Sequence, residues 1–234
     1  MIAFFLMLCD HVGFMLIENG VLYGQNPLYW AQAVATPEGQ KWYLAARILR
    51  LLGRMSFPLF AYFIVEGFLH TSGVGKYIIR MGFFAAVSEV PFDLACFGVV
   101  YNPQYQNVLI TYFIALIALV FMRKAGKVSW LLSVLVAAPF CWIAWVVKCD
   151  YGALGVGLIC LMYLLRRSRK LQLFGGAAVS AAESYEYYGI SALSFLLLRC
   201  YNGQRGEASL KYFFYLMYPL HLAAFYAMVY FANR

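Results

Sequence analysis

Two ionisable residues stand side by side in the middle of the first apolar stretch of the chain. Residues 2–17 are apolar apart from Asp10 and His11. At a rise of about 1.5 Å per residue, His11 lies about 15 Å into a helix, near the centre of a hydrocarbon layer about 30 Å thick. Ionisable groups at that depth are costly and face a protein interior or a wet path. The pair predicts a proton-transfer site or, alternatively, a polar contact between two helices.

A second histidine lies in the last apolar stretch. His221 follows Pro219 by two residues, and this proline leaves the carbonyl of Tyr215 without its helical donor. A central imidazole suits general acid–base chemistry near neutral pH. His221 is therefore the second candidate for proton transfer.

The composition is typical of an integral membrane protein. Of the 234 residues, 64% are hydrophobic and 12% are charged, whereas a soluble domain is about half apolar and a quarter charged. The mean hydropathy is +0.73. The net charge of +8 is read as cytoplasmic loop charge and not as a nucleic-acid signal. We expect a single transmembrane domain over residues 1–234, with no cleavable signal peptide, no metal site and no disulfide among six widely spaced cysteines.

The apolar stretches predict an all-α, polytopic helical bundle of about nine spans (eight to ten), some of them short or broken. The expected spans are 2–17, 55–69, 77–90, 107–122, 128–147, 152–165, 171–182 with 187–198 as one span or two, and 212–231. Nine crossings with a cytoplasmic N-terminus place 12 of the 18 Lys and Arg residues in cytoplasmic loops, which the positive-inside rule favours.

Three local features refine this prediction. Residues 24–41 contain Pro27, Pro37 and Gly39 and are expected to form a loop. Residues 42–53 lead into Arg54 and place Arg47, Arg50 and Arg54 on one helical face, which suggests an interfacial helix with its arginines at the headgroups. Pro91 is expected to end the third span.

Polar residues then sort by depth in this topology. On the cytoplasmic side we expect His70, Lys76, Arg80, Arg205 and Lys211. On the outer side we expect Glu89, Asp93, Asp150, Glu183 and Glu186. A basic cytoplasmic mouth suits a phosphorylated donor, although such clusters also simply obey the topology rule. The turn from Tyr201 to Gly206, with Asn202 and two glycines, either cradles an anion or only joins two helices.

Many short motifs in this chain resemble the TraX family of membrane proteins, whose namesake is linked to N-acetylation of conjugative pilin. The matching motifs are Asp10-His11-Val12-Gly13, Gly53-Arg54-Met55-Ser56-Phe57-Pro58, Glu66-Gly67-Phe68-Leu69-His70, Ser88-Glu89-Val90-Pro91-Phe92-Asp93, Gln106-Asn107-Val108, Asp150-Tyr151-Gly152, Tyr201-Asn202-Gly203 with Arg205-Gly206, Lys211-Tyr212-Phe213, and Tyr218-Pro219-Leu220-His221. The resemblance covers nearly the whole chain.

The resemblance implies a bacterial cytoplasmic-membrane acetyltransferase. The donor would be acetyl-CoA, and the acceptor would be the N-terminal amine of a pilin-like protein or a glycan hydroxyl. His11 is the expected general base or acyl carrier, Asp10 is expected to orient a partner, and His221 is expected to assist. Residues expected to bind the donor are Lys76, Arg80, Arg205 and Lys211, with Asn202 and His70 nearby.

Further polar residues are expected to be structural or to lie on the acceptor side. They are Arg54, paired with Glu89 or Asp93, Glu66, paired with His70, and Asn107 and Asp150.

Two other functions fit the same polar residues. A carboxylate and a histidine at mid-membrane also form proton relays, so a proton-coupled small-molecule transporter is the main alternative. A non-catalytic assembly factor for a surface appendage is the third hypothesis.

Overall fold

The computed structural model describes residues 1–204 and 211–232, except for the side chain of residue 211. These residues are mostly helical, and within them the only β-type pairing is one isolated bridge between Gln106 and Cys149. The predicted all-α class is confirmed. The chain forms two compact units. Unit 1 comprises Met1–Ser56, Val87–Asn102 and the described part of Arg205–Arg234, and unit 2 comprises Phe57–Ala86 and Pro103–Gln204.

Unit 1 is built around a helix that changes its hydrogen-bonding pattern half-way. The α-helix α1 (Ile2–His11) continues directly into the π-helix η1 (Val12–Val21). The N–H of Leu22 donates to the carbonyl of Ile17 at 2.9 Å, the five-residue step of a π-turn. Stretches of π-helix are rare and occur frequently at functional sites.

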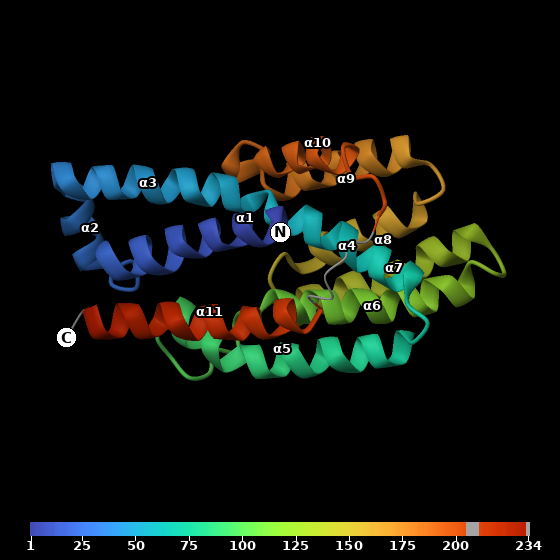
Figure 1. The fold of residues 1–234 in the computed structure, drawn as a ribbon, viewed down its shortest axis with the longest axis horizontal. Helices are drawn as coiled ribbons and strands as arrows, with labels where there is room; N and C mark the ends of the chain where they lie inside the picture. Colours follow the sequence, from blue (N-terminus) through green and yellow to red (C-terminus); the bar gives the residue numbers. More distant parts are fainter. Residues whose placement is uncertain (205–210, 233–234) are drawn as a thin grey trace. The chain divides into compact units, whose positions relative to one another are not determined.

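The stretch predicted to be a loop, residues 24–41, is largely helical. Helix α2 (Pro27–Ala35) and helix α3 (Pro37–Arg54) each begin with a proline. The side chains of Asn26 and Thr36 accept backbone N–H groups as N-caps. Proline fits the first helical turn, where its missing N–H has no helical partner. The prolines that suggested a loop are therefore helix starts. In Figure 1, α3 runs back beside α1 after α2.

Two more segments complete unit 1. Helix α5 (Val74–Phe97) contributes its second half, and α11 (Lys211–Ala232) packs against η1. The prediction that Pro91 ends a span is wrong, because α5 continues through Pro91 to Phe97. A proline inside a helix removes one hydrogen bond but is tolerated where packing supports the helix. The Asn19 amide then donates to the carbonyls of Ala95 and Cys96 at the end of α5.

Unit 2 is a set of closely packed apolar helices. Its long helices are α4 (Ser56–His70), α6 (Val108–Ala125), α7 (Trp130–Val147) and α8 (Gly152–Leu164). Helix α6 packs against both α7 and α8, and Leu116, Leu119 and Ile159 are fully buried there. The Asn107 side chain caps α6 by accepting from Leu109 N–H. Serine caps α7 and α9 (Arg169–Glu183) in the same way.

The ambiguous stretch 171–198 is not one continuous span. Helix α9 ends at Glu183, two short 3₁₀ turns follow (Tyr185–Tyr187 and Ile190–Leu193), and α10 (Ser194–Arg199) is short. Figure 1 shows α10 lying along α9. The hydroxyls of Ser184 and Ser191 are 2.7 Å apart, and the hydroxyl of Ser191 donates to the Ser180 carbonyl. The serines replace backbone bonds that a continuous helix would supply.

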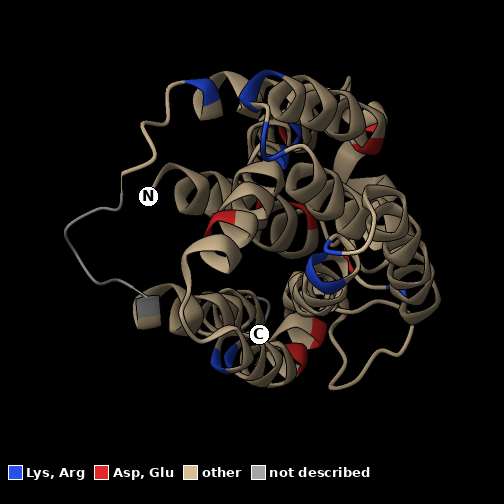
Figure 2. Ribbon diagram, turned by 90° about the vertical axis from the view of Figure 1, so that its right-hand side faces the viewer, with Lys and Arg blue, Asp and Glu red and all other residues tan. Residues whose placement is uncertain are grey.

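Five helical segments in the described residues are long and apolar enough to cross a membrane. They are Ile2–Val21, Pro37–His70, Val108–Ala125, Trp130–Val147 and Tyr212–Ala232, and Gly152–Leu164 and Ile190–Arg199 are shorter apolar helices. The nine predicted crossings are not confirmed. Figure 2 shows Lys, Arg, Asp and Glu confined to short parts of the ribbon. The fold is that of a membrane protein with few charged residues.

Candidate active site

The two predicted central histidines are brought together. Nδ1 of His11, the last residue of α1, lies 2.6 Å from Nε2 of His221 on α11. Their ring planes differ by 11° and the ring centroids are 4.8 Å apart. Because the nitrogens are much closer than the centroids, the rings meet edge to edge, as a ring–ring hydrogen bond requires. This pair of side chains is called the histidine dyad below.

A backbone carbonyl fixes the direction of the hydrogen bond in the dyad. Nδ1 of His221 lies 2.7 Å from the carbonyl oxygen of Met217, one turn earlier in α11. That oxygen can only accept, so in the neutral dyad His221 carries its proton on Nδ1 and accepts on Nε2. His11 must then donate from Nδ1, which leaves its Nε2 with a free lone pair. The arrangement orients His11 as a base, since the bond at one ring nitrogen sets the role of the other.

Aromatic rings enclose the dyad. The Tyr218 ring lies edge-on to both imidazoles, with centroid distances of 6.3 Å to His11 and 5.6 Å to His221, and the Phe225 ring contacts His221 from another side. His221 is 5% exposed, whereas His11 is only partly buried. His11 is therefore the member of the dyad with more access to its surroundings.

Asp10 points to a different helix from its neighbour His11. Its two carboxylate oxygens lie 3.5 Å from Nη1 of Arg50 and 3.8 Å from Nε of Arg54, both on α3. Nε of Arg50 is also 3.9 Å from Oε1 of Glu18, and the Arg50 guanidinium lies 4.7 Å from the centre of the Phe14 ring. We call Asp10, Glu18, Arg50 and Arg54 the charged seam. Consecutive helical residues face about 100° apart, so one helix serves both the seam and the dyad.

Two glycines let the seam form. A Cβ at Gly53 would lie 2.2 Å from Cβ of Asp10, and a Cβ at Gly13 would lie 3.0 Å from the carbonyl oxygen of Ala46. Backbones can approach this closely only where side chains are absent. Because the two backbones are close, the acidic side chains of α1 and η1 can reach the basic side chains of α3. The arginine face of α3 is thus directed at α1 and η1 through Arg50 and Arg54, which corrects the headgroup role predicted for these two residues.

The residues predicted to bind the donor are distributed along three elements. His70, at the end of α4, has Nδ1 3.7 Å from Oε2 of Glu66, so the predicted pair is present. Lys76 is exposed and Arg80 partly buried on α5, where Arg80 lies 5.7 Å from the Tyr77 ring centre. Asn202 is exposed and accepts from Gln204 N–H.

Two other residues predicted to bind the donor are Arg205 and Lys211, and the structure describes them only in part or not at all. Arg205 lies outside the described residues, and of Lys211 only the position at the start of α11 is given. The turn before them has the positive φ expected there, because Gly203 has a φ of +76°.

The predicted outer polar residues hold backbone in place. Oδ2 of Asp93 accepts from Asn102 N–H at 2.7 Å, and the Asn107 amide donates to the Ala85 carbonyl at 2.9 Å. Oδ1 of Asp150 accepts from the Tyr105 hydroxyl and from Tyr151 N–H. Arg54 was expected to pair with Glu89 or Asp93, and one partner that the structure gives it is Asp10, at 3.8 Å. Glu89 lies on α5, two residues before Pro91.

Two members of the charged seam were not among the predicted site residues. Arg50 and Glu18 were missed, since Arg50 looked like one of three headgroup arginines. A usable signal existed in the sequence: Asp10, Phe14 and Glu18 follow a four-residue spacing and share a face. An acidic face and a basic face on two neighbouring apolar helices predict mutual pairing, since unpaired charges in a membrane are costly.

Comparison with known proteins agrees with this architecture. The TraX protein family matches residues 1–229. The chain is also similar to a protein of Dichelobacter nodosus named "Probable fimbrial assembly protein FimC, serogroup H1", with 29% identity over 199 residues that cover 75% of this chain and 80% of that protein. No solved structure matches the chain. Because the family match spans almost the entire sequence, the dyad and the seam included, the chain belongs to the TraX family.

Proposed function

We propose that this protein is an integral membrane acetyltransferase that uses acetyl-CoA from the cytosol. The observation that carries the proposal is the histidine dyad, in which the bond from His221 to the Met217 carbonyl leaves Nε2 of His11 as the free base. An oriented imidazole is the usual group for taking a proton from an attacking amine or hydroxyl.

The chemistry assigned to the dyad is a single acyl transfer. The acceptor nitrogen or oxygen attacks the thioester carbonyl carbon, and the bond from that carbon to sulfur breaks. The acceptor proton passes to Nε2 of His11 and from there to the departing thiolate, which leaves as free CoA. His221 supports the positive charge on His11, because its Nε2 accepts the bond from His11 Nδ1 throughout.

The proposal also covers how the acetyl-CoA donor is bound and which acceptor receives the acetyl group. Basic residues on the proposed cytoplasmic side would hold the donor's phosphates, namely Lys76, Arg80, Arg205 and Lys211, with Asn202 and His70 at the entrance. The acceptor is proposed to be the N-terminal amine of a pilin-like subunit or a glycan hydroxyl, at or across a bacterial cytoplasmic membrane, with the N-terminus of the chain in the cytosol. The name of the D. nodosus relative, a probable fimbrial assembly protein, supports the pilin-like acceptor.

Release of CoA thiol by protein in lipid nanodiscs tests the proposal. Acetyl-CoA is supplied together with either a peptide bearing a free N-terminus or an oligosaccharide. We expect acceptor-dependent release that falls by about 100-fold or more in His11→Ala, the usual contribution of a positioned general base. The matched control is Phe5→Ala on the same helix, because Phe5 is 66% exposed and its ring is not part of the dyad.

Two results would contradict the proposal. One is wild-type turnover in a folded His11→Ala protein. The other is proton-coupled uptake of a solute into liposomes with no acyl transfer to either acceptor, which would assign the dyad to a transporter.

A further inference from the structure

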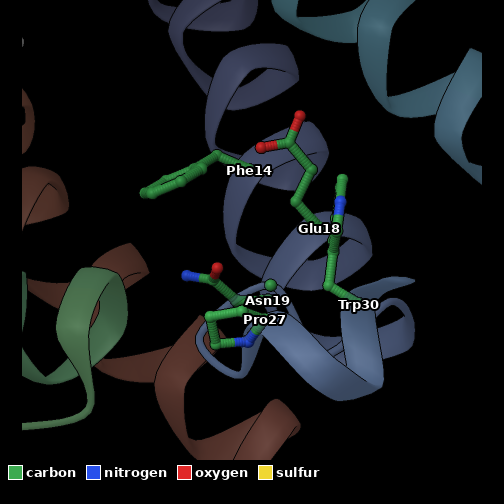
Figure 3. Close-up of a pocket in the computed structure, with 6 residues that line it drawn as sticks. Phe14, Glu18, Asn19, Pro27 and Trp30 are labelled. Carbon is green, nitrogen blue, oxygen red and sulfur yellow. The ribbon is translucent and has the colours of Figure 1, made fainter. Parts of the chain in front are cut away.

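A small cavity opens in unit 1 at the far end of η1. Its volume is about 360 Å³, within the range of small-molecule sites. It is lined by Phe14, Glu18, Asn19, Gly24, Pro27 and Trp30. Figure 3 shows the Glu18 carboxylate between the rings of Phe14 and Trp30, with the Asn19 amide below them. One acid and two aromatic rings therefore surround one space.

The hydrogen-bonding groups of this cavity are mainly acceptors. Both Asn19 Nδ2 contacts go to the carbonyls of Ala95 and Cys96, so the Asn19 group left for a ligand is Oδ1. This oxygen lies beside Gly24, where a Cβ would be 3.0 Å from it. The Glu18 carboxylate adds two more acceptor oxygens, against a single indole N–H from Trp30. Such a set favours a ligand that brings several donors.

Glu18 is held loosely in the charged seam. Among the described residues its ion pair is with Nε of Arg50 at 3.9 Å, beyond hydrogen-bonding distance, whereas Arg50 approaches Asp10 more closely at 3.5 Å. Because Coulomb attraction falls with distance, Arg50 attracts the Asp10 carboxylate more strongly than the Glu18 carboxylate. The faces of Trp and Phe also attract cations electrostatically.

We propose that this cavity binds a protonated primary amine. The ammonium donates to the Glu18 carboxylate and to Asn19 Oδ1, and its alkyl stem lies between Phe14 and Trp30. The site goes beyond the proposed function and stands without it. Glu18 is seven residues, more than one helical turn, further along η1 than His11, so the amine held here is not the group that His11 activates. The cavity would anchor a cationic group of a larger ligand.

Binding of n-butylammonium to the full-length protein in lipid nanodiscs tests the site. Saturation-transfer NMR titrations would compare it with n-butanol, which has the same carbon chain without the charge, and empty nanodiscs would be subtracted. We expect saturable binding of the ammonium at least about tenfold tighter than of the alcohol, equivalent to 1.4 kcal/mol or more. Equal affinity for the two probes, or no saturable binding of the ammonium, overturns the proposal.

Two variants locate the binding. Glu18→Gln keeps the shape of the side chain and is expected to weaken n-butylammonium about tenfold without changing n-butanol. The matched control is Glu38→Gln, the same change in the first turn of α3, which is expected to leave both affinities unchanged. Trp30→Leu is an independent second variant and is expected to weaken the ammonium several-fold. Unchanged ammonium binding in a folded Glu18→Gln or Trp30→Leu protein overturns the assignment to this cavity.

Discussion

Glycines bring helices close together in both units of the molecule, but the side chains beside those glycines differ. The two regions compared are the contact of α1 and η1 with α3 in unit 1 and the contact of α6 with α7 and α8 in unit 2. In unit 1, Gly13 and Gly53 allow two helices to approach closely. In unit 2, a Cβ at Gly155 would lie 3.0 Å from the Phe57 ring and 3.1 Å from Thr111. Small residues at helix crossings are the general means of close packing in membranes.

What fills the space beside the glycines is opposite in the two regions. Unit 1 places two carboxylates and two guanidinium groups there, each 12–18% exposed. Unit 2 places only uncharged side chains beside Gly155, those of Tyr151, Phe57 and Thr111. Apolar packing is sufficient for stability, so the charged contents of unit 1 indicate a role other than holding helices together.

Replacing Arg50 tests this difference most strongly. Arg50→Met leaves Glu18 and Asp10 short of a buried cation, and we expect the free energy of unfolding to fall by about 3 kcal/mol. The parallel change in unit 2 is Arg123→Met, where the guanidinium lies 4.8 Å from the Phe68 ring centre. There we expect a loss of only about 0.5–1 kcal/mol. SDS-titrated unfolding in bicelles measures both values.

A second substitution checks the physical reason. In the Arg50→Met background, Glu18→Gln removes the uncompensated charge and is expected to restore about 1 kcal/mol or more. Equal losses for the Arg50 and Arg123 variants, or no recovery in the double variant, would mean that the seam is not held by charge pairing.

Adding one methyl group at a glycine tests the shared packing device. Gly53→Ala puts a Cβ within 2.2–2.8 Å of three Asp10 atoms, two of them backbone, so we expect a loss of about 1–3 kcal/mol. Gly155→Ala is expected to cost a similar amount. The control is Gly75→Ala on α5, where a Cβ meets nothing within 4 Å. The same unfolding titration applies, and a neutral Gly53→Ala would contradict the close approach of α1 and α3.

The two glycine variants should differ in activity even where they agree in stability. Gly53→Ala displaces Asp10 beside His11 and should lower acyl transfer per folded molecule. Gly155→Ala acts within unit 2 and should leave turnover per folded molecule close to wild type. Equal turnover per folded molecule in the two variants would mean that the charged seam does not contribute to acyl transfer.

A smaller effect than that of the Arg50 variant is expected from the loss of one hydroxyl in unit 2. Ser133, 3% exposed on α7, donates to the Met122 carbonyl on α6 at 3.0 Å. Ser133→Ala should lower the free energy of unfolding by about 1 kcal/mol. Val128→Ala, at an exposed position beside the same turn, is the control and should change it little. A loss above that of Gly53→Ala would reverse the ranking of the two regions.

The sequence predicted the class of fold better than it predicted helix boundaries, and it named His11 and His221 as candidates without predicting that they contact each other. Runs of apolar residues are a direct consequence of membrane solvation, which sequence patterns record well. Pro27, Pro37 and Pro91 misled because a proline at a helix start, a proline in a turn and a proline inside a supported helix look alike in sequence. Tertiary contacts decide among these three cases.

The partners of Asp10 could be anticipated only in part. Asp10 was expected only to orient a partner, and the choice among Arg50, Arg54 and more distant groups depends on how closely α1 and α3 approach. That distance is set by Gly13 and Gly53 together, one on each helix. Their spacing in sequence, 40 residues, gives no local pattern from which to read the contact.

The π-turns after His11 allow this helix to tolerate the loss of one residue. A segment bonded five residues back holds one residue more per turn than an ordinary helix, so a single deletion between Val12 and Val21 can be absorbed by rewinding to the α form. Residues on both sides of the deletion would then keep their facing, because the residue that widened the turn has been removed. A deletion in an ordinary α-helix would instead rotate the residues after it by roughly 100° about the axis. Such a shortened protein should therefore retain both the histidine dyad and the cavity beside Glu18.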